Sequence, residues 1–160
     1  MKNICGYTKQ DLINVRKFIH DINNEIVVRI STDKDWQCSL PQYKLFLGAK
    51  KQPQWLTNVR LEWYKKQDFY IDNVNMSVIS LLHEIGHFET FDVDEWLERN
   101  DLTWQYQQEY CDNDTMTMEQ LNIKYFEIPN EYKATQWAFE YYKNNRQKCD
   151  NLAKILRFQF

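Results

Sequence analysis

Apolar residues recur at helical spacing in two long segments, one near the start of the sequence and one around its middle. In residues 8–23, apolar side chains three and four positions apart predict a helix, and Thr8 is a suitable N-cap. Residues 75–91 show the same spacing, with Asn73 or Asn75 as the residue that caps the first turn. Both segments therefore predict helices with one buried face.

The C-terminal half continues this helical pattern. Residues 130–144 predict a third helix, because Pro129 is well placed in its first turn. Residues 92–110 predict another helix, either continuous or broken near Asn100, and residues 149–160 predict a short terminal helix. The second half of the chain is thus expected to be almost entirely helical.

A different pattern, short and rich in β-branched or alternating apolar residues, fills the region between the first two helices. It predicts strands at 25–30, 43–48, 58–64 and 68–73. The polar stretch at 65–68 suits a hairpin turn between the last two. Residues 25–73 are therefore expected to form a small, mostly antiparallel sheet of three or four strands, which makes the fold class α+β.

Length and composition narrow the class of protein. A chain of 160 residues fits one domain over residues 1–160, and a net charge of −3 argues against a protein that coats nucleic acid. The sequence has no long apolar run typical of a membrane span, and its first residues lack the apolar core of a signal peptide. No two of the four cysteines are spaced as in a zinc knuckle or a redox motif, so reduced thiols are expected. We expect a cytoplasmic protein without a membrane or nucleic-acid partner; the oligomeric state stays open.

The helix predicted at 75–91 carries the sequence HEIGH. His83 and His87 are four residues apart, so both imidazoles project from one face and can bind one metal ion. Glu84 lies about 100° around the helix from His83 and is placed to act as a general base beside the metal. Gly86 lowers helix propensity and suggests that another element approaches closely there. The alternative is a core helix with two buried, hydrogen-bonded histidines.

A catalytic zinc site needs a third protein ligand, and no histidine follows His87. The extended metzincin pattern is therefore excluded, and a carboxylate is expected instead. Glu131 is favoured, because it opens the helix at 130–144 and shares a face with small residues that allow close packing. Asp94 and Glu127 are the rivals, and a helix-capping carboxylate is the alternative role for Glu131.

The segments LLHEIGHFE and EYKATQWA resemble the ImmA/IrrE-type zinc metallopeptidases over about residues 75–145. That family's signature is similar to HELGH followed by E-x-x-A-x-x-F-A, here Glu131, Ala134, Trp137 and Ala138, with Trp in place of Phe. The resemblance implies a zincin-like domain in which Glu131 is the third zinc ligand. The chain departs from the family in the long gap after His87, where residues 92–125 suit an inserted helical segment, and it has no room for the helix-turn-helix domain often attached. As a small stand-alone member, it resembles the metallopeptidase-like proteins encoded by bacteriophages and mobile elements.

These observations lead to two functional hypotheses that share a zinc ion. The first is a metallopeptidase in which Glu84 takes the proton of a zinc-bound water that attacks a peptide bond of an intracellular protein or peptide. The second is a non-cleaving, metallopeptidase-like zinc protein that binds a host or regulatory protein. Asp92 and Asp94 are candidates for orienting the histidine rings, and Tyr125 and Tyr132 for stabilising the oxyanion.

Overall fold

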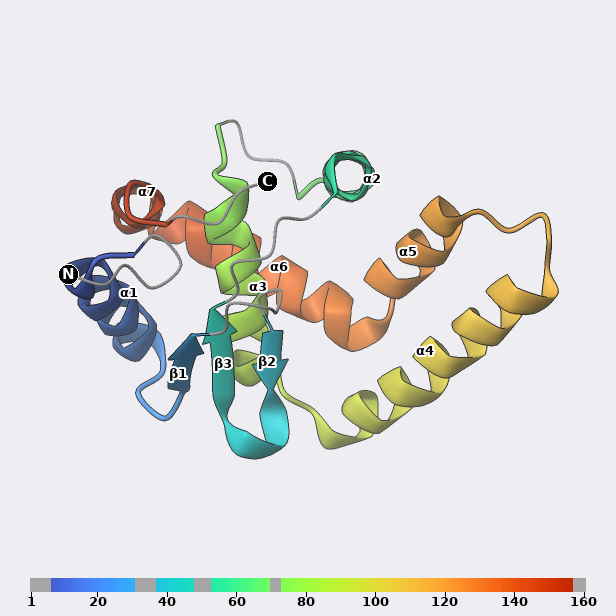
Figure 1. Cartoon of the computed structure of the whole chain (residues 1–160), viewed down its shortest axis with the longest axis horizontal. Coiled ribbons are helices and arrows are strands. Elements are labelled where there is room, and N and C mark those ends of the chain that lie inside the picture. The colour runs from blue at the N-terminus through green and yellow to red at the C-terminus, as the bar shows by residue number, and fades with distance from the viewer. Residues whose placement is uncertain (1–6, 31–36, 48–52, 70–72, 157–160) are drawn as a thin grey trace.

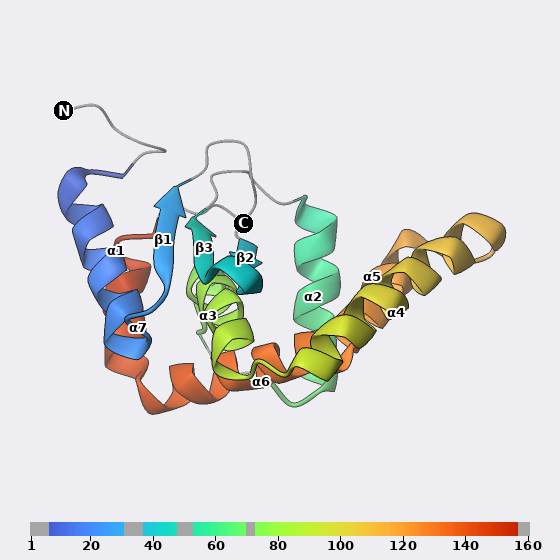
Figure 2. The same cartoon turned by 90° about the horizontal axis from the view of Figure 1, so that it is seen from below.

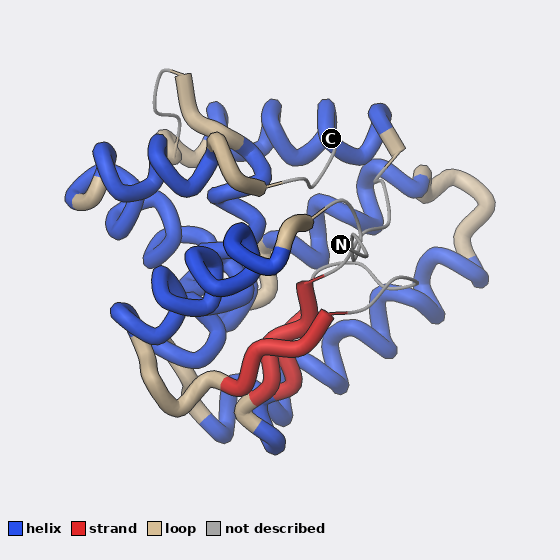
Figure 3. Tube along the Cα trace, turned by 60° about the vertical axis from the view of Figure 1, so that its left-hand side comes forward, coloured by secondary structure: helices blue, strands red, loops and turns tan. Residues whose placement is uncertain are grey.

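The computed structural model describes residues 7–30, 37–47, 53–69 and 73–156. Over these residues the chain is α+β, with helices surrounding one small three-stranded sheet (Figures 1 and 3). The described helices are α1 (Lys9–Ile22), α2 (Gln54–Lys66), α3 (Met76–Glu89), α4 (Val93–Asp112), α5 (Met118–Phe126), α6 (Pro129–Asn144) and α7 (Arg146–Ala153).

The sheet contains β1 (Val27–Ile30), β2 (Gln37–Ser39) and β3 (Lys44–Leu47) in the order β1-β3-β2. The strands predicted at 25–30 and 43–48 are confirmed as β1 and β3. The prediction of a mostly antiparallel sheet is wrong, because β1 pairs with β3 in parallel and only β2 pairs with β3 antiparallel. The sequence pattern did not reveal β2, whose three residues are too few to show a period.

The strand predicted at 58–64 is wrong, because these residues belong to α2. Val59 and Trp63 are both buried and lie four residues apart, so the same apolar positions that alternate as in a strand also share one helical face. The turn expected at 65–68 is the end of this helix. Of the strand predicted at 68–73, residues 70–72 lie outside the described residues, and Phe69 is in no strand.

The predicted helix starts are confirmed where the capping chemistry was clear. Thr8 and Asp11 form a capping box at the start of α1, and Asn75 caps α3 through its side chain. Pro129 occupies the first turn of α6. The Thr8 and Asn75 side chains satisfy backbone N–H groups that have no partner inside their own helix, whereas Pro129 has no N–H that needs one.

Helix α3 is the centre of the fold, with the sheet on one side and α6 crossing it on another (Figures 1 and 2). It contacts α6 unusually closely, because a Cβ placed on Gly86 would lie 2.6 Å from the backbone oxygen of Ala134. Ala134, Thr135 and Ala138 on α6 are all buried. The close approach expected at Gly86 is therefore real, and its partner is α6.

Helices α4 and α5 form an arm that projects from the rest of the molecule (Figure 2). Helix α4 is continuous over 20 residues, so the break considered near Asn100 is absent, and none of its residues is buried. The helix expected at 149–160 starts earlier, and α7 ends at Ala153. Among the described residues, no helix is both long and apolar enough to cross a membrane.

Candidate metal centre

Two histidine rings on adjacent turns of α3 face the start of α6. The ring centroids of His83 and His87 are 4.7 Å apart. The Nε2 atoms of His83 and His87 lie 3.2 and 3.4 Å from the same oxygen, Oε2 of Glu131. Three potential metal ligands therefore converge from two helices that are far apart in sequence.

Glu131 is held at this point by the packing of α6 on α3. It lies in the first turn of α6 and is only 2% exposed, although a carboxylate is seldom buried without partners. Three residues further along, Ala134 meets the backbone at Gly86, which brings the start of α6 beside the histidines. Asp94 and Glu127, the rival carboxylates, belong to none of the groups of potential ligands among the described residues, and Glu127 is exposed.

The distances from Glu131 Oε2 to the two histidine nitrogens are compatible with a zinc ion and also with direct hydrogen bonds. Tetrahedral zinc with nitrogen and oxygen ligands at about 2.0–2.1 Å keeps two such ligand atoms about 3.3–3.4 Å apart. The observed separations of 3.2 and 3.4 Å match that spacing. Two imidazoles and one carboxylate are also a donor set found in catalytic zinc sites.

The second carboxylate oxygen of Glu131 is bound by two residues of the arm. Arg99 of α4 donates through Nε to Oε1 at 2.7 Å, and the hydroxyl of Tyr125 on α5 donates to the same oxygen at 2.8 Å. Arg99 also donates to the Tyr125 hydroxyl at 2.7 Å. These bonds leave Oε2 directed at the histidines and fix the rotation of the carboxylate.

Burial and charge set the protonation of the metal-free site. Burial by itself would raise the pKa of Glu131, but His87 and His83 hold that pKa well below its usual range. Burial would likewise lower the pKa of His87, yet the Glu131 carboxylate raises it. Burial, together with Glu131, raises the pKa of Tyr125, so its hydroxyl stays protonated and available as a donor. Without a metal, the site therefore favours an ionised carboxylate beside a protonated imidazole.

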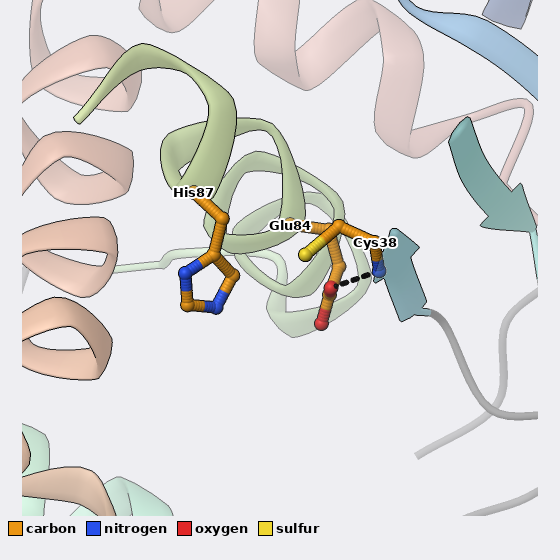
Figure 4. Close-up of side chains that lie close together, drawn as sticks. All are labelled: Cys38, Glu84 and His87. Carbon is orange, nitrogen blue, oxygen red and sulfur yellow. Dashed lines mark hydrogen bonds between the residues drawn. The ribbon is translucent and has the colours of Figure 1, made fainter. Parts of the chain in front are cut away.

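Glu84 lies beside this group, and its carboxylate is hydrogen-bonded to the sheet. One of its carboxylate oxygens accepts a hydrogen bond from the backbone N–H of Cys38 at 2.7 Å. Figure 4 shows Glu84, Cys38 and His87 around one space, with Cys38 coming from strand β2. Glu84 is thus beside the three converging donors without being one of them, as its position in the helix predicted.

A hydroxyl group, rather than a carboxylate, orients the first histidine. Thr135 Oγ1 lies 3.0 Å from Nδ1 of His83, which leaves Nε2 for a metal. The two acids expected to do this lie elsewhere: Asp92 caps α4, and Asp94 is exposed in its first turn. Tyr132 packs against Trp63 and Phe69, so only Tyr125 of the two candidate tyrosines reaches the site.

The candidate site opens into a pocket of about 550 Å³ between β2 and the helices α2 to α6. Its lining includes His83, Glu84, His87 and Glu131. In the part of the chain that the structure describes, Trp63 Nε1, Ser80 Oγ and Asn130 Oδ1 are buried in its walls without hydrogen-bond partners. Buried polar atoms in folded proteins usually have a partner, so these three are expected to bind water or another molecule in the pocket.

The sequence analysis missed three residues of this site: Arg99, Thr135 as a partner of His83, and Cys38. Thr135 could have been found, because it lies one helical turn after Glu131 and so shares its face. No local pattern marks Arg99 or Cys38, which reach the pocket only through tertiary packing. Comparison with protein-family models, curated proteins and solved structures found no match for this chain.

Proposed function

We propose that this protein is a zinc-dependent metallopeptidase with a gluzincin-like ligand set, in which His83, His87 and Glu131 hold the metal and Glu84 is the general base. The observation that carries the proposal is the convergence of three potential ligand atoms, from His83, His87 and Glu131, in a pocket that Glu84 also lines. The resemblance of HEIGH and the later EYKATQWA segment to ImmA/IrrE-type enzymes supports the same function. A zincin-like fold is part of this proposal.

The bound ion would act as a Lewis acid that polarises a peptide carbonyl and lowers the pKa of water to about 7. The residues of the chain then have distinct tasks. Glu84 accepts a proton from water and donates it to the leaving amine. Glu131, held by Arg99 and Tyr125, keeps its Oε2 aimed at the histidines, and Thr135 holds the ring of His83.

Strand β2 supplies a place for the substrate backbone. Among the described residues it is an edge strand, it lines the pocket, and the Cys38 N–H is directed at Glu84 rather than paired with β3. A peptide in extended conformation can add to such an edge by backbone hydrogen bonds. We therefore expect the substrate to be an extended peptide or an unfolded segment of a protein, lying between β2 and Glu84.

A non-cleaving zinc protein that binds a protein partner is the second candidate. It is favoured by the apolar side chains on the outer surface of the arm: Val93, Leu97 and Trp104 are 56%, 54% and 65% exposed. Exposed apolar patches of this kind often mark interaction sites. The two functions differ in whether Glu84 is needed.

The test is a peptide-cleavage assay on protein purified without chelator, with metal content measured in parallel. Glu84→Gln should lower kcat/KM by about 10²- to 10⁴-fold, because it removes the general base, while zinc stays near one per chain. Glu62→Gln, on the exposed side of α2, is the matched control and should behave as the unmodified protein. Zinc without cleavage of any peptide in a diverse library would leave the binding protein as the better function. Absence of zinc, even after loading, would overturn both.

A further inference from the structure

Cys38 places a sulfur atom at the edge of the candidate metal centre. It lies in the middle of β2, is partly buried, and is a free cysteine. Its Sγ, a carboxylate oxygen of Glu84 and a ring nitrogen of His87 all lie within 4.8 Å of one another (Figure 4). This group and the group of His83, His87 and Glu131 share one member, His87.

The other described cysteines show that this position is unusual for the chain. Cys149 is buried in the hydrophobic core, where a thiol acts as a small apolar side chain. Cys111 lies exposed near the end of α4. Only Cys38, of these three, belongs to a group of potential metal ligands.

We propose that Cys38 is a reversible fourth protein ligand of the ion held by His83, His87 and Glu131. The inference rests on the proposed zinc site and adds a means of regulating it. Zinc binds thiolate sulfur at about 2.3 Å, so tetrahedral geometry puts sulfur and nitrogen ligands about 3.6 Å apart. Among the described residues, Sγ lies within 4.8 Å of a ring nitrogen of His87 but belongs to no group of potential ligands with His83 or Glu131, so coordination requires Cys38 to move toward these two residues.

Coordination by Cys38 would close the centre. Zinc sites with four protein ligands are structural, whereas catalytic sites keep one position for water or substrate. Forming the sulfur–metal bond releases the thiol proton to solvent, and breaking it takes a proton back as water regains the position. The chain would thus have a resting state with four protein ligands and an active state with three.

The position of Cys38 on β2 couples this change to substrate binding. The same residue donates its N–H to Glu84, on the side of β2 that pairs with no other described strand. A peptide that pairs with this edge competes for that N–H and displaces the Cys38–Glu84 contact. Substrate binding would therefore have two effects at once: it would free Glu84, the general base, and it would draw Cys38 Sγ away from the metal.

Cobalt(II) in place of zinc gives a direct test, because a cobalt–thiolate bond has an intense charge-transfer band in the near ultraviolet. The unmodified protein should show this band, and Cys38→Ser should lose it while keeping the weaker visible bands of the ion. Cys111→Ser is the matched control and should retain the band. Zinc affinity of Cys38→Ser should fall by at least about tenfold, a loss typical of groups that support a metal site.

A second measurement uses the unmodified chain and so does not depend on the variant folding. Alkylation of each cysteine is followed by mass spectrometry with and without zinc. Zinc should slow alkylation of Cys38 several-fold and leave Cys111 unchanged. If one ion binds per chain without a charge-transfer band and without protection of Cys38, this inference is overturned while the proposed zinc site stands. If no ion binds, the zinc site itself is wrong, and the inference is overturned with it.

Discussion

The α3–α6 pair and the α4–α5 arm both contribute residues to the candidate site, but they differ in how deeply they are buried. In α3, ten of 14 residues are buried, and Gly86 meets the backbone of Ala134 directly. In α4, none of 20 residues is buried. Yet Arg99 of α4 and Tyr125 of α5 bind the carboxylate that the pair brings to the histidines.

A metal centre requires that its ligands be held both in position and in orientation, and the two regions serve these requirements separately. The positions of the ligands depend on elements that cannot shift, because a close-packed interface has few alternative arrangements. The orientation of the third ligand depends on hydrogen bonds from residues outside that interface. We expect changes in the pair to alter stability and metal binding together, and changes in the arm to alter metal binding alone.

The largest expected effect on the metal comes from Glu131→Gln. If Glu131 is the proposed third ligand, removing its charge should lower zinc affinity by more than about 100-fold, beyond the loss typical of supporting residues. A competition titration with a zinc chelator measures it, and Glu127→Gln, exposed just before α6, is the control. A change below tenfold would mean that Glu131 is a helix-capping carboxylate and not a ligand.

The contribution of the arm is tested by Arg99→Gln. Losing the donor to Oε1 should lower zinc affinity by about 10- to 100-fold, since Glu131 is then less well oriented. Arg16→Gln on the exposed side of α1 removes the same charge far from the site and should have no effect. Equal weakening in both variants would point to net charge rather than to orientation.

The pair is tested by Gly86→Ala. The added Cβ would lie 2.6 Å from the Ala134 backbone oxygen, so α3 and α6 must separate. Overpacking costs about 1–3 kcal/mol, and the gain in helix propensity offsets about 1 kcal/mol of it, so a net loss of up to about 2 kcal/mol in the free energy of unfolding is expected. Urea unfolding measures it, with Gln108→Ala on the exposed surface of α4 as the control. Unchanged stability would show that the interface is looser than described.

The smallest and most specific effect is a pH dependence of the metal-free protein. Because the pKa of His87 is raised, its stabilisation is complete below the unfolded pKa of about 6.5 and is lost as pH rises through the folded pKa. The lowered pKa of Glu131 affects stability only at acid pH. The stabilisation by Glu131 is lost as pH falls through the pKa of the folded state. Above pH 6.5, stability should therefore decline by at most about 1.4 kcal/mol per pH unit.

Zinc affinity should change in the opposite direction over the same range, because histidine binds metal only when deprotonated. Urea unfolding of chelator-treated protein at several pH values, beside zinc titrations, measures both trends. His87→Gln should remove most of the decline in stability, and His20→Gln, exposed on α1, should leave it unchanged. Parallel trends of stability and affinity would contradict the pairing of His87 with Glu131.

The sequence by itself determined the helices with clear caps and the placement of His83, Glu84 and His87 on one helix. Thr8, Asn75 and Pro129 start their helices as predicted, because capping is a local interaction of a side chain with nearby backbone. The spacing of His83 and His87 puts both rings on one face for the same reason. Local geometry was not enough at 58–64, where one set of apolar positions fits both a strand and a helix. In the structure these residues form part of α2, with Val59 and Trp63 buried on one helical face.

Only the tertiary structure decided what surrounds the two histidines. The meeting of Glu131 with His83 and His87 could be anticipated from small residues on one helical face, but its distance depends on how closely α6 packs on Gly86. The contacts of Arg99 with Glu131 and of Cys38 with Glu84 join residues that are 32 and 46 positions apart. No periodicity in a sequence encodes such contacts, because they depend on the relative placement of whole elements, which is determined by the packing of the core.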